Sequence, residues 1–581
     1  MAQKVGQLKF SAFVVCAFFV ASPLAHAQIA PEPIISGFAR TLPVTARNGM
    51  VVSQEEKASR IGVEILKAGG NAVDAAVATG FALAVTLPRA GNLGGGGFML
   101  VHLAQQQKTV AIDYRETAPG AATRDMFLDA RGAFVPAKSQ SSGLAVGTPG
   151  TVAGLALAHE TYGSGRFTLA QLVAPAIALA RDGIAVEGDL AFSLGEIRTR
   201  LARHPSSRAI FMPGDAPLRP GDILVQRDLA ASLERIARDG VAGFYQGETA
   251  QKIVASVQGA GGMMTLQDMR DYRAIAREPV RGSYRGHDIV SMPPPSSGGV
   301  HVIQILNMLE AFPLGELGQN SAATLHLMSE AMKRAYADRE IWLGDPDFVK
   351  VPVAGLISKT YAGQLRKGIS LERATPSHEI SADDPARYES DQTTHYSVVD
   401  KDGNAVANTY TLNFSYGLGL VADGTGILLN NELDDFAATE GASNAFGLRG
   451  GNANAPEPRK RPLSSMSPTM VFRNGELDIV TGTPGGSRII TTVLQIVSNM
   501  IDHGMNPAEA SEAVRVHHQL HPDELRVERG LSIDTIRLLE AKGHVVRLQR
   551  AMGSAQTIQR TRGLLYGAAD TRQAGTAAIG Y

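Results

Sequence analysis

Cysteine is almost absent from this chain of 581 residues. The only one, Cys16, lies within an N-terminal apolar run. A mature protein that has lost this run would contain no thiol, no disulfide and no cysteine-ligated metal. Cysteine–histidine mechanisms are excluded as well, so any covalent chemistry would have to use a hydroxyl oxygen or an amine.

An excess of charge of either sign is also missing. The 55 basic and 56 acidic side chains leave a net charge of −1, which gives no electrostatic footprint for nucleic acid or an anionic membrane. The hydrophobic content of 44% and charged content of 19% are ordinary for a soluble globular enzyme. The length exceeds one compact core, so we expect a second large lobe or a large composite domain.

Apolar runs long enough to span a bilayer are absent. The run Phe10 to Val20 is short, follows Lys4 and Lys9, and precedes the small-x-small sequence Ala25-His26-Ala27. This pattern predicts a signal peptide over residues 1–27 and an exported protein, periplasmic or secreted.

A convincing metal or phosphate motif is lacking too. His517, His518 and His521 have no carboxylate at the usual ligand spacing, and adjacent histidines on a helix point to different faces. The glycines from Gly91 to Gly97 lead into an apolar strand without a following Lys-Ser/Thr, which favours close backbone packing near a buried site over phosphate binding. No Gly-x-Ser-x-Gly elbow occurs. We therefore expect neither a metal nor a cofactor.

Periodicity predicts a mixed α/β chain, with a helix-rich middle over residues 150–350. Residues 393–413 are expected to form a hairpin of two strands with an Asp-Gly turn at its centre. The expected helices are 55–70, 72–87 (apolar on nearly every face), 300–311, 321–340 (amphipathic) and 489–501; the expected strands are 98–102, 393–400 and 405–413.

A polar, charged segment from Arg373 to Asp391 leads directly to Gln392 and Thr393, and we expect it to be exposed and mobile. If the Gln392–Thr393 peptide bond is cut, Thr393 gains a free α-amine beside its own hydroxyl. An amine with a pKa of about 8 can take the hydroxyl proton at neutral pH. Thr393 would then combine nucleophile and base in one residue.

Several long motifs, in register over almost the whole mature chain, resemble the γ-glutamyltransferase (glutathione hydrolase) family of Ntn-hydrolases. They are Thr393 to Asp400, Thr411-Leu412-Asn413, Asn431 to Phe436, Arg461 to Pro468 and Pro484 to Arg488. The resemblance implies an αββα sandwich built from two fragments of one self-cleaved precursor. The large subunit would be residues 28–392 and the small subunit 393–581, held together as a heterodimer.

The same resemblance implies the chemistry of the cut. Thr393 attacks the carbonyl of Gln392, and the freed Thr393 then attacks γ-glutamyl carbonyls through an acyl-enzyme. The Thr411 hydroxyl would hold the Thr393 amine, whereas strand propensity alone could also explain this threonine. Gly485 and Gly486 precede a helix and would supply backbone N–H groups as an oxyanion hole.

The substrate's α-amino acid end needs both of its charges matched. By resemblance, Arg115 forks the α-carboxylate with help from Ser464 and Ser465, a geometry that lysine cannot copy. Glu432 and Asp435 resemble the acids that hold the α-ammonium; a solvated acidic turn is the alternative interpretation.

Two further residues complete the predicted substrate pocket. Asn413 lies near the ammonium-binding acids. Phe446 falls in a lid loop, residues 437–450, where many bacterial members of the family carry tyrosine. The ring can still cover the pocket, but a hydrogen-bonded gate through the hydroxyl is lost.

The implied substrates are glutathione and γ-glutamyl amides, with water, amino acids or peptides as acceptors. Two alternatives remain: a sister acylase of the same fold that cleaves glutaryl-cephalosporins, and an unprocessed, non-catalytic binding protein. Glu432 and Asp435 distinguish a γ-glutamyltransferase from the glutaryl acylase, because a glutaryl group has no ammonium to bind.

Overall fold

The computed structural model describes Met1 and residues 41–382, 394–439, 441 and 443–581. Residues 41–581 form one compact unit, so the length is accommodated by a large composite domain. Several predictions lie outside the described residues. They concern the signal peptide, Cys16, residues 383–391 of the polar segment, Gln392 and Thr393. None of the helices within the described ranges is long and apolar enough to cross a membrane.

Two seven-stranded sheets, stacked face to face, form the centre of the unit. The first contains, in order, β1 (Val44–Ala46), β18 (Leu564–Ala569), β17 (Gln556–Thr561), β13 (Glu476–Thr481), β12 (Thr469–Arg473), β9 (His287–Ser291) and β8 (Val280–Tyr284). The second contains β19 (Ala577–Gly580), β2 (Gly49–Ser53), β10 (Thr394–Asp400), β11 (Ala405–Thr411), β3 (Gly96–Leu103), β4 (Lys108–Tyr114) and β7 (Ile275–Arg277).

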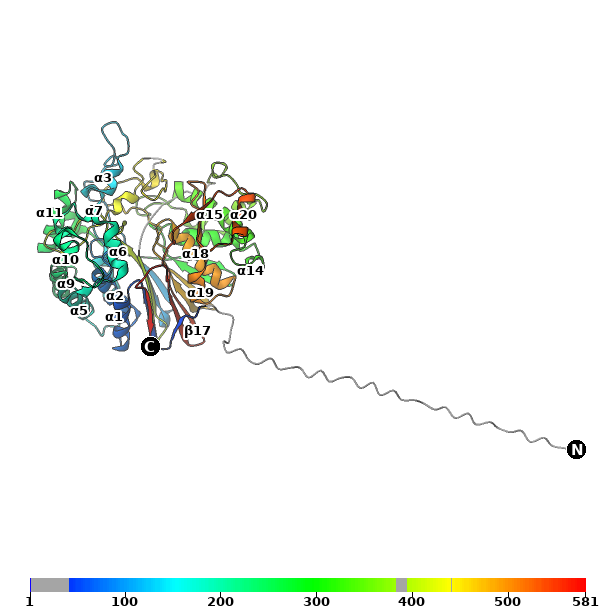
Figure 1. The fold of residues 1–581 in the computed structure, drawn as a ribbon, viewed down its shortest axis with the longest axis horizontal. Coiled ribbons are helices and arrows are strands. Elements are labelled where there is room, and N and C mark those ends of the chain that lie inside the picture. Colours follow the sequence, from blue (N-terminus) through cyan, green and yellow to red (C-terminus); the bar gives the residue numbers. More distant parts are fainter. Residues whose placement is uncertain (2–40, 383–393, 440, 442) are drawn as a thin grey trace. The chain divides into compact units, whose positions relative to one another are not determined.

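Helices cover the outer face of each sheet, which completes the predicted αββα sandwich (Figure 1). On the second sheet lie α1 (Glu56–Lys67), α2 (Ala72–Thr86) and α4 (Thr151–Tyr162), backed by α5 (Leu169–Asp182), α9 (Arg227–Asp239), α10 (Ala242–Tyr245) and α11 (Gly247–Gly259). On the first sheet lie α13 (Gly298–Leu309), α18 (Arg488–Ile501) and α19 (Pro507–Glu512), with α15 (Ala322–Trp342), α17 (Lys359–Lys367) and α20 (Ile533–Ala541) beyond them.

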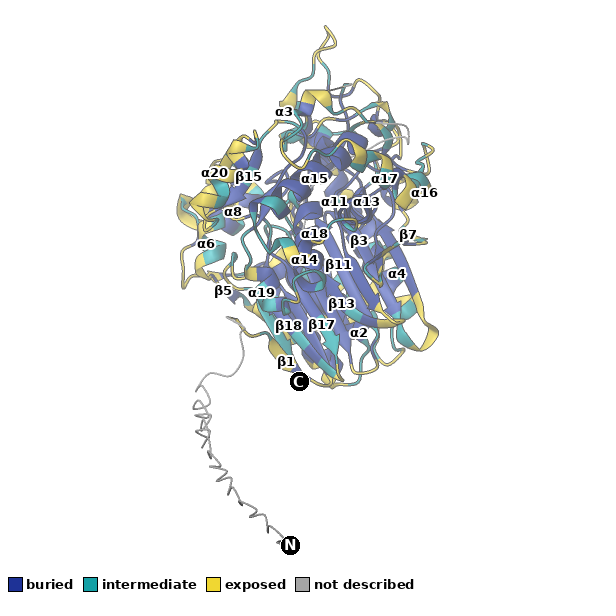
Figure 2. Cartoon of the chain, turned by 90° about the vertical axis from the view of Figure 1, so that its right-hand side faces the viewer, coloured by how far each residue is buried: buried dark blue, intermediate teal, exposed yellow. Residues whose placement is uncertain are grey.

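Smaller elements decorate this frame, and most of their exposed residues lie at the periphery (Figure 2). They are α3 (Pro136–Gln140), α6 (Gly188–Glu196), α7 (Arg198–Leu201), α8 (Pro205–Phe211), α12 (Leu266–Asp271), α14 (Leu314–Leu317), α16 (Val353–Leu356), β5 (Ile184–Ala185), β6 (Ile223–Leu224), β14 (Val516–His517), β15 (Leu525–Glu528) and β16 (Val546–Gln549).

The hairpin of β10 and β11 lies in the middle of the second sheet. Its residues are buried on both faces, between β2 on one side and β3 on the other. The Asp400 carboxylate accepts hydrogen bonds from the backbone N–H groups of Asp402 and Asn404 at 2.9 and 3.0 Å, and Gly403 takes φ = +86°. These are the contacts that an Asp-Gly turn provides, and they confirm the predicted hairpin.

Helix α2 packs against both strands of the hairpin. Asn71 and Asp74 form a capping box at its start, and every residue from Ala72 to Thr86 is buried. The predicted all-apolar helix is confirmed, and such a helix can only lie inside a core. Asp400 also accepts a hydrogen bond from the Ala72 N–H at 3.0 Å, which joins the turn to the helix.

Helix α15 differs from its predicted character. The expected amphipathic helix is buried along almost its whole length, including charged side chains. Glu330 neutralises Lys333 at 2.5 Å and Arg334 at 2.8 Å one turn further on, so the charges are paired inside the protein instead of facing water. The predicted helix-rich middle is confirmed, and it also contains the strands β7, β8 and β9.

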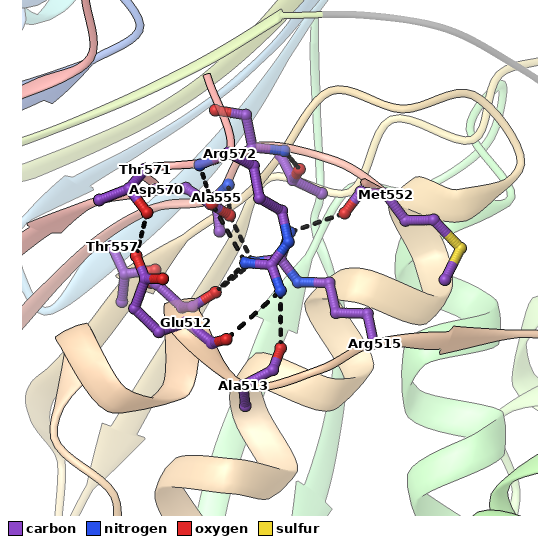
Figure 3. A network of polar contacts seen from close by, with 12 residues as sticks. Glu512, Ala513, Arg515, Met552, Ala555, Thr557, Asp570, Thr571 and Arg572 are labelled. Carbon is purple, nitrogen blue, oxygen red and sulfur yellow. Dashed lines mark hydrogen bonds and ion pairs between the residues drawn. The ribbon is translucent and has the colours of Figure 1, made fainter. Parts of the chain in front are cut away.

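Near the C-terminus, two arginines tie the end of the first sheet to its covering helix (Figure 3). Arg515 pairs with Asp570 and donates to the Met552 carbonyl at 2.7 Å. Arg572 pairs with Glu528 at 2.6 Å and donates to the Ala513 carbonyl at 2.8 Å. These groups come from the segment after α19, from β15, from the segment before β17 and from the segment after β18. They therefore fix the chain that returns to form β19.

Candidate active site

The strand that follows the predicted cut is placed by pairing on both sides. β10 begins at Thr394, which lies opposite Tyr410 of β11. Thr411 is the next residue of β11 and is 1% exposed, and its hydroxyl oxygen accepts a hydrogen bond from the Asn413 N–H at 2.8 Å. Thr411 therefore lies at the end of the hairpin where the chain enters from Thr393, although Thr393 is outside the described residues.

The predicted glycine packing is confirmed on the other side of Thr411. An added Cβ at Gly95 would lie 1.9 Å from the Thr411 carbonyl oxygen, and one at Gly94 would lie 2.1 Å from the Leu428 carbonyl oxygen. Such distances are incompatible with any side chain. The glycines let β3 approach the end of the hairpin closely, next to the buried site described below.

Arg115 is the centre of a buried ionic cluster. Its guanidinium pairs with Glu432, with Asp435 at 2.6 Å and with Glu116 at 3.8 Å, and all four side chains are fully buried. It also donates to the Pro462 and Leu463 carbonyl oxygens at 2.9 Å each. The acids thus raise the pKa of Arg115 against the effect of burial, so the guanidinium is charged.

The structure brings together residues that are more than three hundred positions apart in sequence. The acids come from a 3₁₀ turn, Glu432–Asp435, and Arg115 follows β4 directly. Arg115 was predicted to fork a substrate carboxylate, but here its donors are engaged by the two acids predicted to hold the ammonium and by two carbonyls. A substrate carboxylate would have to compete for these N–H groups.

Asn413 extends the cluster toward the hairpin. It has φ = +70°, and its amide donates to the Asn431 carbonyl at 2.9 Å, immediately before Glu432. Its side-chain oxygen is buried without a hydrogen-bond partner among the described residues. A buried, unpaired amide oxygen is costly and suits a ligand that donates a hydrogen bond.

Ser464 and Ser465 are fully buried beside the two carbonyls that Arg115 contacts. The Ser464 oxygen accepts from the Met466 N–H at 3.2 Å, so its hydroxyl proton can still be donated. Ser465 is hydrogen-bonded to Arg339, a buried arginine of α15. Nothing in the sequence pattern singled out Arg339, because its helix was predicted to be amphipathic.

Phe446 lies in the predicted lid loop and packs against Phe414. Its ring meets the Phe414 ring edge to face, with centroids 5.5 Å apart and planes at 87°. In the same loop, Asn444 donates to Asp435 at 3.3 Å. The loop is therefore attached both to an acid of the ionic cluster and to the residue that follows Asn413.

Gly485 and Gly486 precede α18 and take φ of +140° and +69°. Within the described part of the chain, neither N–H has an acceptor, as an oxyanion hole requires. Among the described residues, the two glycines make no backbone hydrogen bond to the ionic cluster. Gln519 connects the regions: it accepts from the Ser487 hydroxyl at 2.8 Å and donates to the Phe446 carbonyl at 3.2 Å.

The histidines considered as metal ligands have protein partners. His517 is hydrogen-bonded to Thr491 and Gln519, both at 2.9 Å, and His518 lies 3.3 Å from Asp523. His521 contacts Glu340 only at 4.0 Å.

Another group, His326, Glu330 and His544, has ligand atoms within 4.8 Å of one another. A metal there would have to displace Lys333 and Arg334 from Glu330. This group fits a hydrogen-bonded ion-pair network better than a metal site.

Comparison with known proteins agrees with this fold. A family model described as gamma-glutamyltranspeptidase matches residues 58–580. The glutathione hydrolase proenzyme of Escherichia coli (strain K12) is 56% identical over 541 residues, 93% of each chain. The chain belongs to the γ-glutamyltranspeptidase family, which is the family indicated by the motifs.

Solved structures support the same assignment. The crystal structure of a cephalosporin acylase from Bacillus halodurans matches with a TM-score of 0.83 and 28% identity, over 95% of this chain and 99% of that one. The Helicobacter pylori gamma-glutamyltranspeptidase structure matches with a TM-score of 0.56 and 45% identity, over 60% of this chain and 97% of that one. The Ntn-hydrolase sandwich is thereby confirmed.

The ionic cluster yields a prediction about stability. Arg115→Met would leave buried acids without their cation, which costs about 3–5 kcal/mol. We expect a clearly lower thermal unfolding midpoint, with partial recovery when Glu432→Gln removes one of the stranded charges. Arg238→Met is the matched control because Arg238 pairs with Asp239 at the surface. If Arg115→Met and Arg238→Met have the same unfolding midpoint, the buried ion pairs of Arg115 do not stabilise the fold.

Proposed function

We propose that the protein is a self-cleaving γ-glutamyltransferase and glutathione hydrolase. It cuts its own Gln392–Thr393 bond and then transfers the γ-glutamyl group of glutathione and γ-glutamyl amides to water, amino acids or peptides. The 56% identity to a glutathione hydrolase proenzyme supports this proposal. The two fragments would be residues 28–392, after removal of the signal peptide 1–27 during export, and residues 393–581.

The observation that carries the proposal is the buried pairing of Arg115 with Glu432 and Asp435. An α-amino acid end carries an ammonium and a carboxylate a few ångströms apart, and a site for it needs fixed charges of both signs. The acids and the Asn413 oxygen can accept from the ammonium. The Ser464 hydroxyl and the Arg115 guanidinium can then donate hydrogen bonds to the substrate carboxylate.

The chemistry follows from the residues at the end of the hairpin. The free amine of Thr393 takes the proton of its own hydroxyl, and the oxygen attacks the γ-carbonyl. The γ-amide C–N bond then breaks, the leaving amine departs with that proton, and the γ-glutamyl group remains as an ester on Thr393. The unpaired N–H groups of Gly485 and Gly486 suit the oxyanion that develops. Water or an amino group then attacks the ester carbonyl, releases the acyl group and restores the Thr393 hydroxyl.

A denaturing gel tests the cut. Wild-type protein is expected to give two bands divided at Thr393, as identified by N-terminal sequencing, whereas Thr393→Ala gives one uncut chain. Thr394→Ala removes the neighbouring hydroxyl and should still be cut. A single wild-type band would favour the non-catalytic binding protein.

A second candidate is a glutaryl-cephalosporin acylase, favoured by the structural likeness to a cephalosporin acylase. The buried acids argue against it, because a glutaryl group offers no cation for the negative charge that Arg115 alone does not balance.

Asp435→Asn separates the two acyl preferences. Loss of one buried partner of the ammonium should cost about 3 kcal/mol, roughly a hundredfold in kcat/KM for a γ-glutamyl anilide. The kcat/KM for a glutaryl anilide should change little. Asp434→Asn serves as the control, since Asp434 hydrogen-bonds Ser139 at 2.5 Å and was assigned no substrate role. Equal losses on both anilides would count against ammonium recognition.

Phe446→Ala tests the lid loop. The ring pair with Phe414 contributes about 0.5–1.5 kcal/mol beyond area burial, so its loss should loosen the loop. We expect a raised donor KM and more hydrolysis relative to transfer, measured with and without an amino acid acceptor. Phe192→Ala removes an exposed ring of α6 for comparison. An unchanged KM and ratio would rule out lid control by this residue.

A further inference from the structure

The ionic cluster contains more acid than its cation can balance. Three carboxyl groups, Glu116, Glu432 and Asp435, surround the single guanidinium of Arg115, and all four side chains are fully buried. If every acid were ionised, the cluster would hold two uncompensated negative charges away from water. Burial makes that arrangement very unfavourable, so the surplus has to be relieved by protons or by a bound cation.

Glu116 is the acid with the poorest partners. Neither of its carboxyl oxygens has a hydrogen-bond partner among the described residues, and one carboxyl oxygen of Glu432 also lacks one. Its distance to Arg115 is 3.8 Å, against 2.6 Å for Asp435. The guanidinium therefore serves Glu432 and Asp435 first, and Glu116 remains a buried acid without a cation of its own.

The backbone leaves space for the Glu116 carboxyl group beside the hairpin. A Cβ at Gly96 would lie 2.6 Å from a Glu116 carboxyl oxygen, and one at Gly147 would lie 2.8 Å from the Glu116 Cβ. Gly96 is the strand partner of Thr411. Glu116 is thus the member of the ionic cluster that packs beside the end of the hairpin, next to the proposed nucleophile.

The groups facing Glu116 explain how it titrates. Burial raises the pKa of Glu116, the charge of Arg115 lowers it, and the charge of Asp113 raises it. Burial likewise raises the pKa of Glu432, and Glu116 and Asp435 add to that rise. The nearby hydroxyls of Tyr245 and Tyr272 stay neutral, because burial raises their pKa values as well.

We propose that Glu116 and Glu432 share one proton before substrate binds, and that the α-ammonium of a γ-glutamyl compound replaces it. The carboxyl O–H bond breaks and the proton passes to solvent, while the ammonium donates to the two ionised acids. Glu116 is then a specificity-determining residue, because only a ligand with a cation at this position can compensate the pair. This inference rests on the proposed γ-glutamyl function.

The test is to count protons during binding by titration calorimetry in two buffers of different ionisation enthalpy. The probe is L-glutamate, which keeps the α-amino acid end and has no amide to cleave. Wild-type protein should release about one proton per bound glutamate at pH values below about 7, because burial raises the pKa of Glu116 to about 7. Towards lower pH the glutamate affinity should fall, up to about tenfold per pH unit.

Matched ligands and variants isolate the pair. 2-Hydroxyglutarate keeps both carboxylates but replaces the ammonium with a hydroxyl, so it should release no proton. In Glu116→Gln the shared carboxyl pair is gone, and the proton count for glutamate should fall toward zero. Asp434→Asn changes a neighbouring buried acid outside the pair and should leave the count as in wild type.

Proton release that is absent in wild type, or undiminished in Glu116→Gln, would overturn the inference. If Glu116→Gln does not fold, the wild-type comparison of glutamate with 2-hydroxyglutarate decides by itself. Turnover of a γ-glutamyl anilide by the same preparation separates the two proposals. Turnover without proton release rejects only the shared proton, whereas protein that is uncut, inactive and does not bind glutamate rejects both.

Discussion

The structure depends on the backbone hydrogen bonds that hold one hairpin between two other strands. β10 pairs with β2, and β11 pairs with β3, so a hairpin from beyond residue 393 is enclosed by strands from the first quarter of the chain. β19, from the C-terminal end, closes the other side of β2. A break in the chain before Thr394 would disrupt none of these strand pairings. A cut chain of this topology can therefore remain one folded body.

The same pairing determines where the chemistry can take place. Gly96 lies opposite Thr411, and its lack of a side chain allows the Glu116 carboxyl group to pack against the end of the hairpin. Arg115, next in sequence to Glu116, then joins β4 to the 3₁₀ turn that carries Glu432 and Asp435. The proposed recognition site and the hairpin next to the proposed nucleophile are thus linked through a few buried contacts.

Local patterns predicted the elements well where the physics is local. The Asp-Gly turn after Asp400 and the apolar run over residues 72–87 are examples, because turn chemistry and uniform apolarity each allow one structure. Helix α15 was misjudged because Glu330 finds Lys333 and Arg334 within its own helix, and spacing alone cannot tell paired charges from solvated ones. The motifs of the family correctly indicated the fold from several segments in register.

The arrangement of the site lay beyond sequence reasoning for a different reason. Arg115 and Glu432 are separated by more than three hundred residues, and their contact follows from the stacking of whole sheets and loops. Assigning Arg115 to a carboxylate and the acids to an ammonium treats them as independent binders, yet the structure pairs them with each other. Once paired, the charges must be counted together. That count, three acids to one guanidinium, is the reason for proposing Glu116 as part of recognition, because a site built only to bind a carboxylate would have no use for a third buried acid beside Gly96.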